Sequence, residues 1–296
     1  MWLADQWNDY EVIDCSKGEK LERWGDYLLV RPDPQVIWDT PKKEKGWRKM
    51  TGHYHRSSKG GGEWEFFQLP KEWTIQYSLP INKKLTFHLK PFSFKHTGLF
   101  PEQAANWNWF SQLIADAVSK GRQVKVLNLF AYTGGATLAA AAAGASVTHV
   151  DASKGMVTWA KENAISSGLK DAPIRWLVDD CVKFVEREIR RGNHYDAIIM
   201  DPPSYGRGPK GEIWKIEESV YPLIQLCSQI LTDNPLFFLI NSYTTGLQPA
   251  VLSYMISTVL GTANGTVTAS EIGLPVSSNG LVLPCGASGR YEATGI

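Results

Sequence analysis

The sequence has few cysteines and no paired cysteine motif. Its 296 residues include four cysteines, widely spaced and never in a Cys-x-x-Cys pair: Cys15, Cys181, Cys227 and Cys285. This spacing argues against a zinc site and is typical of reduced thiols in a cytosolic protein. We therefore predict that the protein binds no metal.

Long apolar runs are also missing. No stretch approaches the roughly 20 apolar residues that a membrane-spanning helix needs. The opening residues, MWLADQWNDYEV, have neither the basic start nor the apolar core of a secretory signal. These absences predict a soluble cytoplasmic protein without a membrane partner.

There is no excess of charge of either sign. The chain has 31 Lys and Arg residues against 30 Asp and Glu residues, so its formal net charge is +1. This balance gives no global reason to expect a polyanionic partner. Any surface that binds nucleic acid must therefore be a local patch.

One basic segment lies between Pro41 and Gly60. It has a single acid, Glu44, against seven basic residues: Lys42, Lys43, Lys45, Arg48, Lys49, Arg56 and Lys59. The rings of Trp47, His53, Tyr54 and His55 are interleaved with them. Basic residues mixed with aromatic rings can bind phosphates and stack bases, but charged runs are usually solvated loops. Both interpretations stay open.

Residues 1 to about 83 differ from the rest of the chain in composition and in sequence pattern. Short runs with β propensity are separated by clusters of Pro, Gly and Lys. The runs are Tyr27 to Val30, Gln35 to Trp38, Glu63 to Gln68 and Trp73 to Ser78. We predict a small, mostly β N-terminal domain over 1–83, a candidate for binding RNA or substrate, and a second domain over 84–296.

The second domain is organised around KVLNLFAYTGGATLAAAAAGASVTHVD, residues 125–151. It opens with Lys125 to Phe130, an apolar run of the length expected for a buried parallel strand. Gly134 and Gly135 follow, and because they lack Cβ the backbone can turn tightly and approach a ligand. An alanine-rich helix then leads to a second strand, which ends at Asp151.

At the end of that strand, Asp151 is placed to accept hydrogen bonds from the hydroxyl groups of a ribose. The glycine turn, however, reads AYTGGAT and lacks the GxGxxG pattern that supports a pyrophosphate at a helix N-terminus. A nucleoside ligand without a pyrophosphate fits better, which favours S-adenosylmethionine. Taken alone, this stretch is equally consistent with a plain βαβ unit whose glycines serve packing.

Helices and strands alternate through the rest of the second domain. Helices are predicted over 104–120, 153–168, 182–191, 213–231 and 249–260, and strands over 174–178, 195–200 and 236–241. Two final strands, 267–275 and 281–291, read as a hairpin. The predicted fold class is α/β, a Rossmann-like doubly wound sheet with an antiparallel C-terminal hairpin.

Asp201-Pro202-Pro203-Ser204-Tyr205 is the most specific short motif and comes directly after the fourth strand. Its two prolines fix φ and remove two N–H donors, so local carbonyl oxygens are free to point outward. A rigid carbonyl beside Asp201 can accept a hydrogen bond from the amino group of a planar base, which can stack on Tyr205. A plain proline turn would explain the prolines but not the adjacent acid and aromatic ring.

These motifs together resemble a known family. The matching segments occur in the right order: HTGLFPEQ (96–103), VLNLFAYTGGATLAAAAAGA (126–145), VDASKGMVTWAKENAISSGL (150–169), DDCVKFV (179–185) and DPPSYGRG (201–208). The second domain is similar to class I S-adenosylmethionine-dependent methyltransferases. More narrowly, it resembles the bacterial group that includes 23S ribosomal RNA methyltransferases with an N-terminal β appendage. Residues 1–83 match far less well.

The resemblance implies a cofactor role for each matching residue. The turn after the first strand would cradle the methionine part of S-adenosylmethionine, through Phe130, Tyr132, Thr133, Gly134 and Gly135. Asp151 would hold the ribose hydroxyls, with Ala152 and Ser153 beside the adenine. Asp180 would accept from the adenine amino group, and the backbone N–H of Cys181 would reach the ring.

The resemblance also implies where the chemistry occurs. Thr97 and Phe100 would close the site from the entry segment, while Asp201 and Pro202 would face the transferred methyl group and the substrate. Tyr205 completes the predicted catalytic set. Methyl transfer from a sulfonium is an in-line displacement that needs positioning more than acid–base chemistry. No catalytic triad is therefore expected.

A cysteine is lacking where cytosine C5 methylation needs a thiolate, beside the fourth or fifth strand. Ser204 and Ser242 stand there, and Cys285 lies on the late hairpin, a poor place for that role. We predict methylation of a nitrogen or an oxygen of RNA, 23S rRNA in particular. The alternatives are a methyltransferase for a protein or small molecule and a protein that binds RNA or cofactor without turnover. A nicotinamide-dependent oxidoreductase is disfavoured by the missing GxGxxG.

Overall fold

The computed structural model describes residues 1–208 and 210–295, and within these ranges an eight-stranded sheet forms the centre. Its strand order is β1-β16-β17-β15-β12-β9-β10-β11. The parallel part contains β15 (Phe237–Ser242), β12 (Ala197–Met200), β9 (Lys125–Leu129), β10 (Ser146–Asp151) and β11 (Ile174–Val178). The predicted doubly wound sheet is confirmed.

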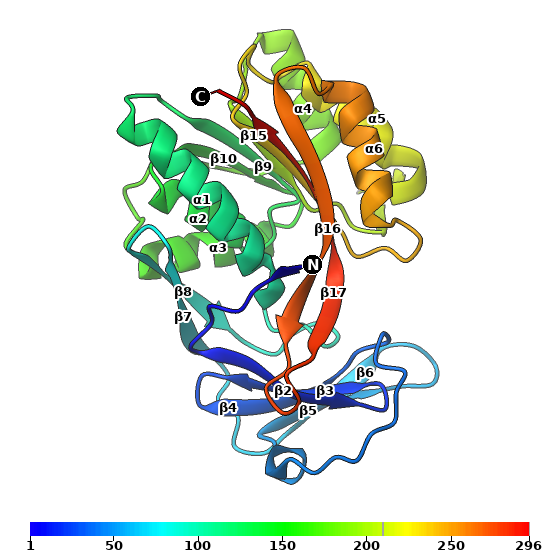
Figure 1. The fold of residues 1–296 in the computed structure, drawn as a ribbon. Helices are drawn as coiled ribbons and strands as arrows, with labels where there is room; N and C mark the ends of the chain where they lie inside the picture. The colour runs from blue at the N-terminus through cyan, green and yellow to red at the C-terminus, as the bar shows by residue number, and fades with distance from the viewer. Residues whose placement is uncertain (209, 296) are drawn as a thin grey trace.

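Helices cover both faces of this sheet (Figure 1). On one face lie α1 (Ala104–Ser119), α2 (Gly135–Ala142) and α3 (Lys154–Ser166). On the other lie α4 (Cys181–Arg191), α5 (Ile216–Ser228) and α6 (Pro249–Leu260). Because helices shield both faces, every residue of β12 and β15 is buried, as expected for continuous apolar strands in a parallel sheet.

Helix α3 begins and ends where its sequence provides capping residues. The Ser153 side chain accepts a hydrogen bond from the backbone N–H of Met156 at the N-terminus. After the C-terminus, Gly168 has a φ of 73°, in the left-handed region that glycine adopts readily.

The C-terminal strands form the predicted antiparallel hairpin, β16 (Gly265–Pro275) and β17 (Val282–Ala293). Its β17 strand joins the central sheet by antiparallel pairing with β15. The tip of the hairpin reaches the N-terminal sheet (Figure 1), where the backbone N–H groups of Ser277 and Ser278 donate to the carbonyls of Val12 and Ile13. The last segment of the chain thus ties the two sheets together.

The N-terminal region consists mainly of β strands. In the described chain its larger sheet has the order β2 (Tyr10–Ser16), β3 (Glu19–Trp24), β4 (Tyr27–Pro32), β5 (Gly52–Arg56) and β6 (Gly62–Phe66). A separate hairpin contains β7 (Trp73–Leu79) and β8 (Lys83–Leu89), and short 3-10 helices cover Lys45–Arg48 and Pro101–Gln103. By contrast, β1 (Trp2–Leu3) pairs in parallel with β16 of the central sheet.

The run from Gln35 to Trp38 forms no strand, although its residues have β propensity. The segment begins as a turn around Asp33. The Asp33 carboxylate accepts a hydrogen bond from the backbone N–H of Gln35, and the Asp33 backbone carbonyl accepts one from the N–H of Val36. Turn chemistry at Asp33 and Pro34 therefore overrides the local β propensity.

The helix predicted over 213–231 is shorter than expected. Its first residues form β14 (Ile213–Lys215), which pairs antiparallel with β13 (Tyr205–Arg207). The Trp214 indole N–H donates to the Pro203 carbonyl at 2.7 Å, so the start of this segment is bound to the proline turn and not to a helix.

A hydrophobic core is shared by the N-terminal region and the first helix layer. Tyr10 and Trp24 belong to the same buried cluster as Trp107 of α1. Trp7 joins the two parts: its ring centroid lies 4.5 Å from that of Tyr77 and 6.2 Å from that of Trp107. The other layer, under α4, α5 and α6, has its own cluster.

Candidate functional site

The carboxyl ends of the parallel strands meet at one edge of the sheet. β9 lies between β10, which follows it in the chain, and β12, which comes later, so the strand order reverses between β9 and β12. Ligands of doubly wound sheets bind at such a switch point. Asp151 ends β10 and Asp201 follows β12, so the fold places both predicted acids at this edge.

The loop after β9 has an unusual backbone. Phe130 and Tyr132 have φ angles of 54° and 52°, in the left-handed region that side chains with Cβ rarely adopt. The loop is held in place because the Thr133 hydroxyl donates to the Gly98 carbonyl at 2.6 Å. Backbone conformations of this cost persist where the surroundings impose them, often at ligand-binding loops.

A small cavity of about 60 Å³ opens at this loop. Six of the predicted site residues line it: Phe100, Phe130, Tyr132, Thr133, Gly135 and Asp201. It is also lined by four residues that the sequence motifs do not single out as site residues, Gln103, Trp107, Asn128 and Asn241. They come from α1, β9, β15 and the segment before α1, which only the fold brings together.

Two buried hydroxyl groups of this region lack partners. Tyr132 OH and Thr97 Oγ1 have no hydrogen-bond partner within the described residues. A buried polar atom without a partner lowers stability by about 1–3 kcal/mol. Their presence indicates a site that is completed by a polar ligand.

Asp151 is fixed by backbone donors. Its two carboxylate oxygens accept hydrogen bonds from the N–H groups of Tyr132 at 2.9 Å and Ser153 at 2.8 Å. Burial nevertheless raises the pKa of Asp151 above its usual value. Each oxygen can accept a second hydrogen bond, so the side chain can bind a hydroxyl pair beside the exposed Ala152 and Ser153.

The start of α4 lies at the same edge. Asp180 caps this helix, since one of its oxygens accepts from the N–H of Lys183 at 2.8 Å and the other has no hydrogen bond within the described chain. Cys181 is buried, and burial raises the pKa of its thiol, whose sulfur accepts from the N–H of Phe130 at 3.3 Å. The side chain is therefore structural, while the N–H groups of a first helical turn have no intrahelical partner.

Asp201 is half-buried and lies near the buried carboxyl group of Glu102. Burial and the neighbouring Glu102 raise the pKa of Asp201 to about 7. Burial also raises the pKa of Glu102, which accepts a hydrogen bond from Tyr243 OH at 3.0 Å. The Gln103 amide donates in turn to Tyr243 OH at 2.8 Å. The matching segment HTGLFPEQ contains Glu102, but its pairing with the end of β15 appears only in the fold.

Tyr205 does not line the cavity. It is 51% exposed on the β13–β14 hairpin, and its hydroxyl accepts from Arg207 Nε at 2.8 Å. The aromatic ring that the same hairpin brings to the strand ends is Trp214, whose centroid lies 5.3 Å from that of Phe130. Spacing from the proline motif gave no sign of Trp214, because it joins the motif only through the hairpin.

Comparison with known proteins identifies the family. Residues 63–214 match the profile of the S-adenosylmethionine-dependent methyltransferases. The chain belongs to this family. A solved S-adenosylmethionine-dependent methyltransferase from Agrobacterium tumefaciens is 36% identical, with a TM-score of 0.87, over 97% of this chain and 91% of that one. A solved methyltransferase from Streptococcus mutans, at 18% identity and a TM-score of 0.73, has the same fold over 97% of this chain and 76% of that one.

Two relatives of this methyltransferase are named as ribosomal RNA large subunit methyltransferase K/L. The one from Shewanella baltica is 35% identical over 223 residues, and the one from Pseudoalteromonas atlantica is 28% identical over 253. The matches cover 71% and 76% of this chain but only 28% and 33% of those proteins. The methyltransferase thus spans a third or less of their length.

The cofactor of this methyltransferase is S-adenosylmethionine, as the family establishes. The residues at the strand ends fit it: the buried hydroxyls without partners, the constrained loop after β9 and the Asp151 carboxylate provide a polar cradle without a pyrophosphate site. Within the described residues no group of three or more His, Cys, Asp or Glu side chains could hold a metal ion. Nor does any helix described here have the length and apolarity to cross a membrane.

Proposed function

We propose that this methyltransferase methylates a nitrogen or an oxygen of RNA, with large-subunit ribosomal RNA as its substrate. The names of its relatives support the substrate. The observation that carries the proposal is the Asp201-Pro202 turn at the switch point, near the buried Glu102 and the Tyr243 hydroxyl that donates to it. Work on ribosomal RNA would place the protein in the cytoplasm.

The cofactor side of the site is assigned as follows. S-adenosylmethionine, when bound, supplies an electrophilic methyl group. The loop after β9 would hold its methionine part through Phe130, Tyr132, Thr133, Gly134 and Gly135. Asp151 would bind the ribose, with Ala152 and Ser153 next to the adenine, while Asp180 and the N–H of Cys181 would bind its edge. Thr97 and Phe100 would close the site.

The acceptor side is assigned to the proline turn. The Pro202 carbonyl accepts no hydrogen bond within the described chain, so it is available to an amino group of the acceptor. The pKa of Asp201, about 7, lets its carboxylate take up a proton released from an attacking nitrogen or hydroxyl near neutral pH. The main task of these groups is to align the attacking atom.

Cytosine C5 chemistry is disfavoured for a physical reason. The hairpin places Cys285 in the wall of a neighbouring cavity. Cys285 therefore lies closer to the site than its position in the chain suggested. Burial and the nearby Glu102 hold the pKa of Cys285 far above its usual value, so it stays a thiol and is not a nucleophile. A protein or a small molecule remains the second candidate substrate.

Transfer of a radiolabelled methyl group from S-adenosylmethionine tests the proposal, with a 23S rRNA transcript, tRNA and a protein extract as acceptors. We expect label in the 23S rRNA. Asp201→Asn should lower transfer by about 10² to 10⁴, with the affinity for S-adenosylhomocysteine kept within a few-fold.

Asp171→Asn is the matched control, since Asp171 is exposed and lies before β11, away from the cavity. It should leave both transfer and affinity unchanged. Label in protein but not in RNA would refute the substrate, and undiminished transfer by Asp201→Asn would refute the role of the proline turn.

A further inference from the structure

A second cavity, of about 450 Å³, adjoins the cofactor site. It shares Leu99 and Phe100 with the small cavity at the loop after β9. Its other walls come from β3, β4 and the turn after β4, from the segment after β15, and from the β16–β17 hairpin. It therefore lies where the N-terminal sheet meets the catalytic edge, and its size suits a small organic ligand.

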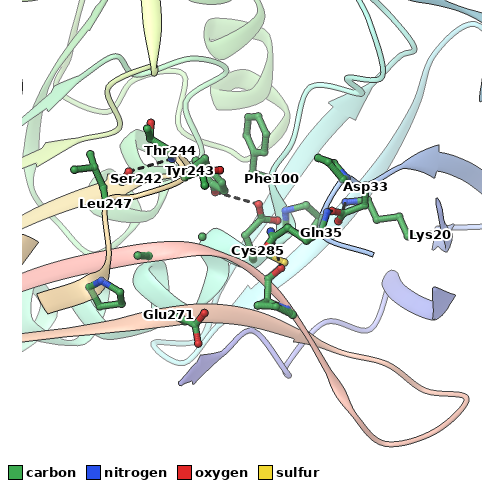
Figure 2. A pocket seen from close by; sticks show the side chains of 18 of the residues that line it. Lys20, Asp33, Gln35, Phe100, Ser242, Tyr243, Thr244, Leu247, Glu271 and Cys285 are labelled. Atoms are coloured by element: carbon green, nitrogen blue, oxygen red, sulfur yellow. Dashed lines mark hydrogen bonds and ion pairs between the residues drawn. The ribbon is translucent and has the colours of Figure 1, made fainter. Parts of the chain in front are cut away.

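The two ends of this cavity differ in chemistry. Figure 2 shows Phe100 and Tyr243 on one side and Lys20 and Asp33 on the other. The rings of Phe100 and Tyr243 have centroids 5.6 Å apart at an interplanar angle of 35°, next to the buried Glu102. One end thus offers aromatic faces close to Asp201, and the other offers charge.

Most cations of the charged end are already neutralised. Lys20 lies 3.8 Å from a Glu22 carboxylate oxygen and 3.7 Å from one of Asp33. Arg31 binds both oxygens of Glu22, at 2.6 and 2.7 Å. These pairs explain how a cluster of charges is buried without a ligand.

Lys95 is different. Its ammonium group donates to the Pro32 carbonyl at 2.9 Å and forms no ion pair within the described residues. Burial and the nearby Lys20 and Arg31 outweigh the attraction of Asp33 and Glu22, and they lower the pKa of Lys95 to about 8. An ammonium group has three donors, and a half-buried one that forms no ion pair is stabilised further by an anionic ligand.

We propose that this cavity is the acceptor pocket, in which one unstacked nucleotide lies with its base against Phe100 and Tyr243 and its phosphate on Lys95. The proposal rests on the proposed function, since it takes the acceptor to be a nucleotide of RNA. Enzymes that modify a base must remove it from its stack, and aromatic faces then replace the lost stacking. Lys95 is thereby a positioning residue, which sets where the base lies relative to Asp201.

The residue before Lys95 supports the proposal that the RNA strand passes this end of the cavity. Phe94 is 63% exposed, has a φ of 58°, and is anchored by a hydrogen bond from the Trp64 indole N–H to its carbonyl at 2.9 Å. An exposed ring beside a phosphate-binding lysine is typical of surfaces that bind single-stranded RNA. The neighbouring nucleotide of the acceptor strand would stack there.

The first test separates RNA binding from chemistry. Lys95→Met should raise the KM for the 23S rRNA transcript by about 10-fold, while Lys95→Arg keeps the charge and should stay within about 2-fold of the wild type. Affinity for S-adenosylhomocysteine should not change in either variant. Lys161→Met is the matched control, because Lys161 is exposed on α3 and lines neither cavity. An unchanged KM in Lys95→Met would overturn the assignment.

The second test needs no turnover. The wild-type protein, saturated with S-adenosylhomocysteine, is treated with an amine-labelling reagent, and the labelling rates of Lys95 and Lys161 are read by mass spectrometry. Guanosine and adenosine 5′-monophosphates should slow labelling of Lys95 at least 5-fold and leave Lys161 unaffected. The nucleosides without phosphate and inorganic phosphate alone should protect less.

The outcomes distinguish the two proposals. If the protein methylates no RNA but nucleotides protect Lys95, the nucleotide pocket stands and the RNA substrate falls. If RNA is methylated while nucleotides fail to protect Lys95, the pocket assignment falls and the proposed function stands. Equal protection by inorganic phosphate would show a simple anion site and overturn the nucleotide pocket.

Discussion

At the scale of single residues, the catalytic edge is set up for positive charge. Asp201 is half-buried and lies near the buried Glu102, and loss of solvent contact raises the pKa of both carboxyl groups. Like charges this close disfavour simultaneous ionisation. A cation brought into the site would favour the ionised carboxylates. The two carboxyl groups would therefore favour a positively charged cofactor, at a free-energy cost to the protein without one.

That cost predicts a pH-dependent stability difference. Asp201 has a pKa near 7 when folded, above its unfolded value of about 3.9. Its contribution to stability is thus complete below pH 4 and is lost as the pH rises through about 7. At pH 8 we expect the free energy of unfolding of Asp201→Asn to exceed that of the wild type by about 2 kcal/mol. The variant should therefore unfold at a higher temperature. At pH 4 the two proteins should unfold at similar temperatures.

Thermal unfolding of the cofactor-free proteins across this pH range is the measurement. Asp171→Asn, an exposed carboxyl group, serves as control and should show no such trend. A constant difference between Asp201→Asn and the wild type at all pH values would mean that Asp201 does not titrate near 7.

Residues of the site differ in how far the sequence could reveal them. Asp151 and Asp201 were predictable because each follows an apolar run that reads as a strand, and strand ends meet at one edge. Glu102 and Lys95 were not, because their importance comes from burial between segments far apart in the chain. The positive φ angles of Phe130 and Tyr132 likewise depend on tertiary contacts.

At the scale of elements, the start of α2 is fitted tightly against α1. A Cβ built on Gly135 would lie 2.6 Å from Cζ2 of Trp107, whose ring is buried in the core and cannot move freely. The sequence suggested that Gly135 gives a ligand close access to the backbone. The structure adds a packing reason, since the helix could not approach α1 with a larger residue.

Gly135→Ala should therefore destabilise the protein by about 1–3 kcal/mol, because overpacking outweighs the gain in helix propensity. The shifted helix start should also displace the loop after β9 and weaken S-adenosylhomocysteine binding several-fold. Chemical denaturation and calorimetric titration measure the two effects.

Gly155→Ala is the matched control in the first turn of α3. The nearest atom to a Cβ there is 3.8 Å away, so the substitution meets no obstacle and should raise stability by up to about 1 kcal/mol. If Gly135→Ala behaved in the same way, the contact with Trp107 would not constrain the helix.

Elements with strong periodicity were predicted well, and those bound by tertiary polar contacts were not. Helices α1, α3 and α6 and the C-terminal hairpin follow their sequence patterns closely. Strands β2 and β3 could not be predicted because charged residues interrupt their alternation of apolar and polar side chains. Glu22, for example, is buried only because Arg31 binds it. The β13–β14 hairpin is short and held partly by Trp214, so no local signal marks it.

At the scale of the whole molecule, the N-terminal region is not simply appended. Composition predicts a boundary near residue 83, but β1 pairs with the central sheet, and the tip of the β16–β17 hairpin pairs with β2. Hydrophobic residues of both parts form one cluster. The larger cavity lies at their junction, so its shape depends on the two parts staying together.

This shared core predicts cooperative unfolding. We expect a single calorimetric transition for the full chain, with coincident midpoints by tryptophan fluorescence and far-UV circular dichroism. Trp7 contacts Tyr77 and Trp107 and donates to the Pro101 carbonyl at 2.9 Å. Trp7→Ala should thus lower the free energy of unfolding by about 3 kcal/mol and shift that one transition to a lower temperature. Ile37→Ala, at a side chain 89% exposed, should leave the transition unchanged. Two separate transitions, with Trp7→Ala moving only one, would instead support independently folding domains divided near residue 83.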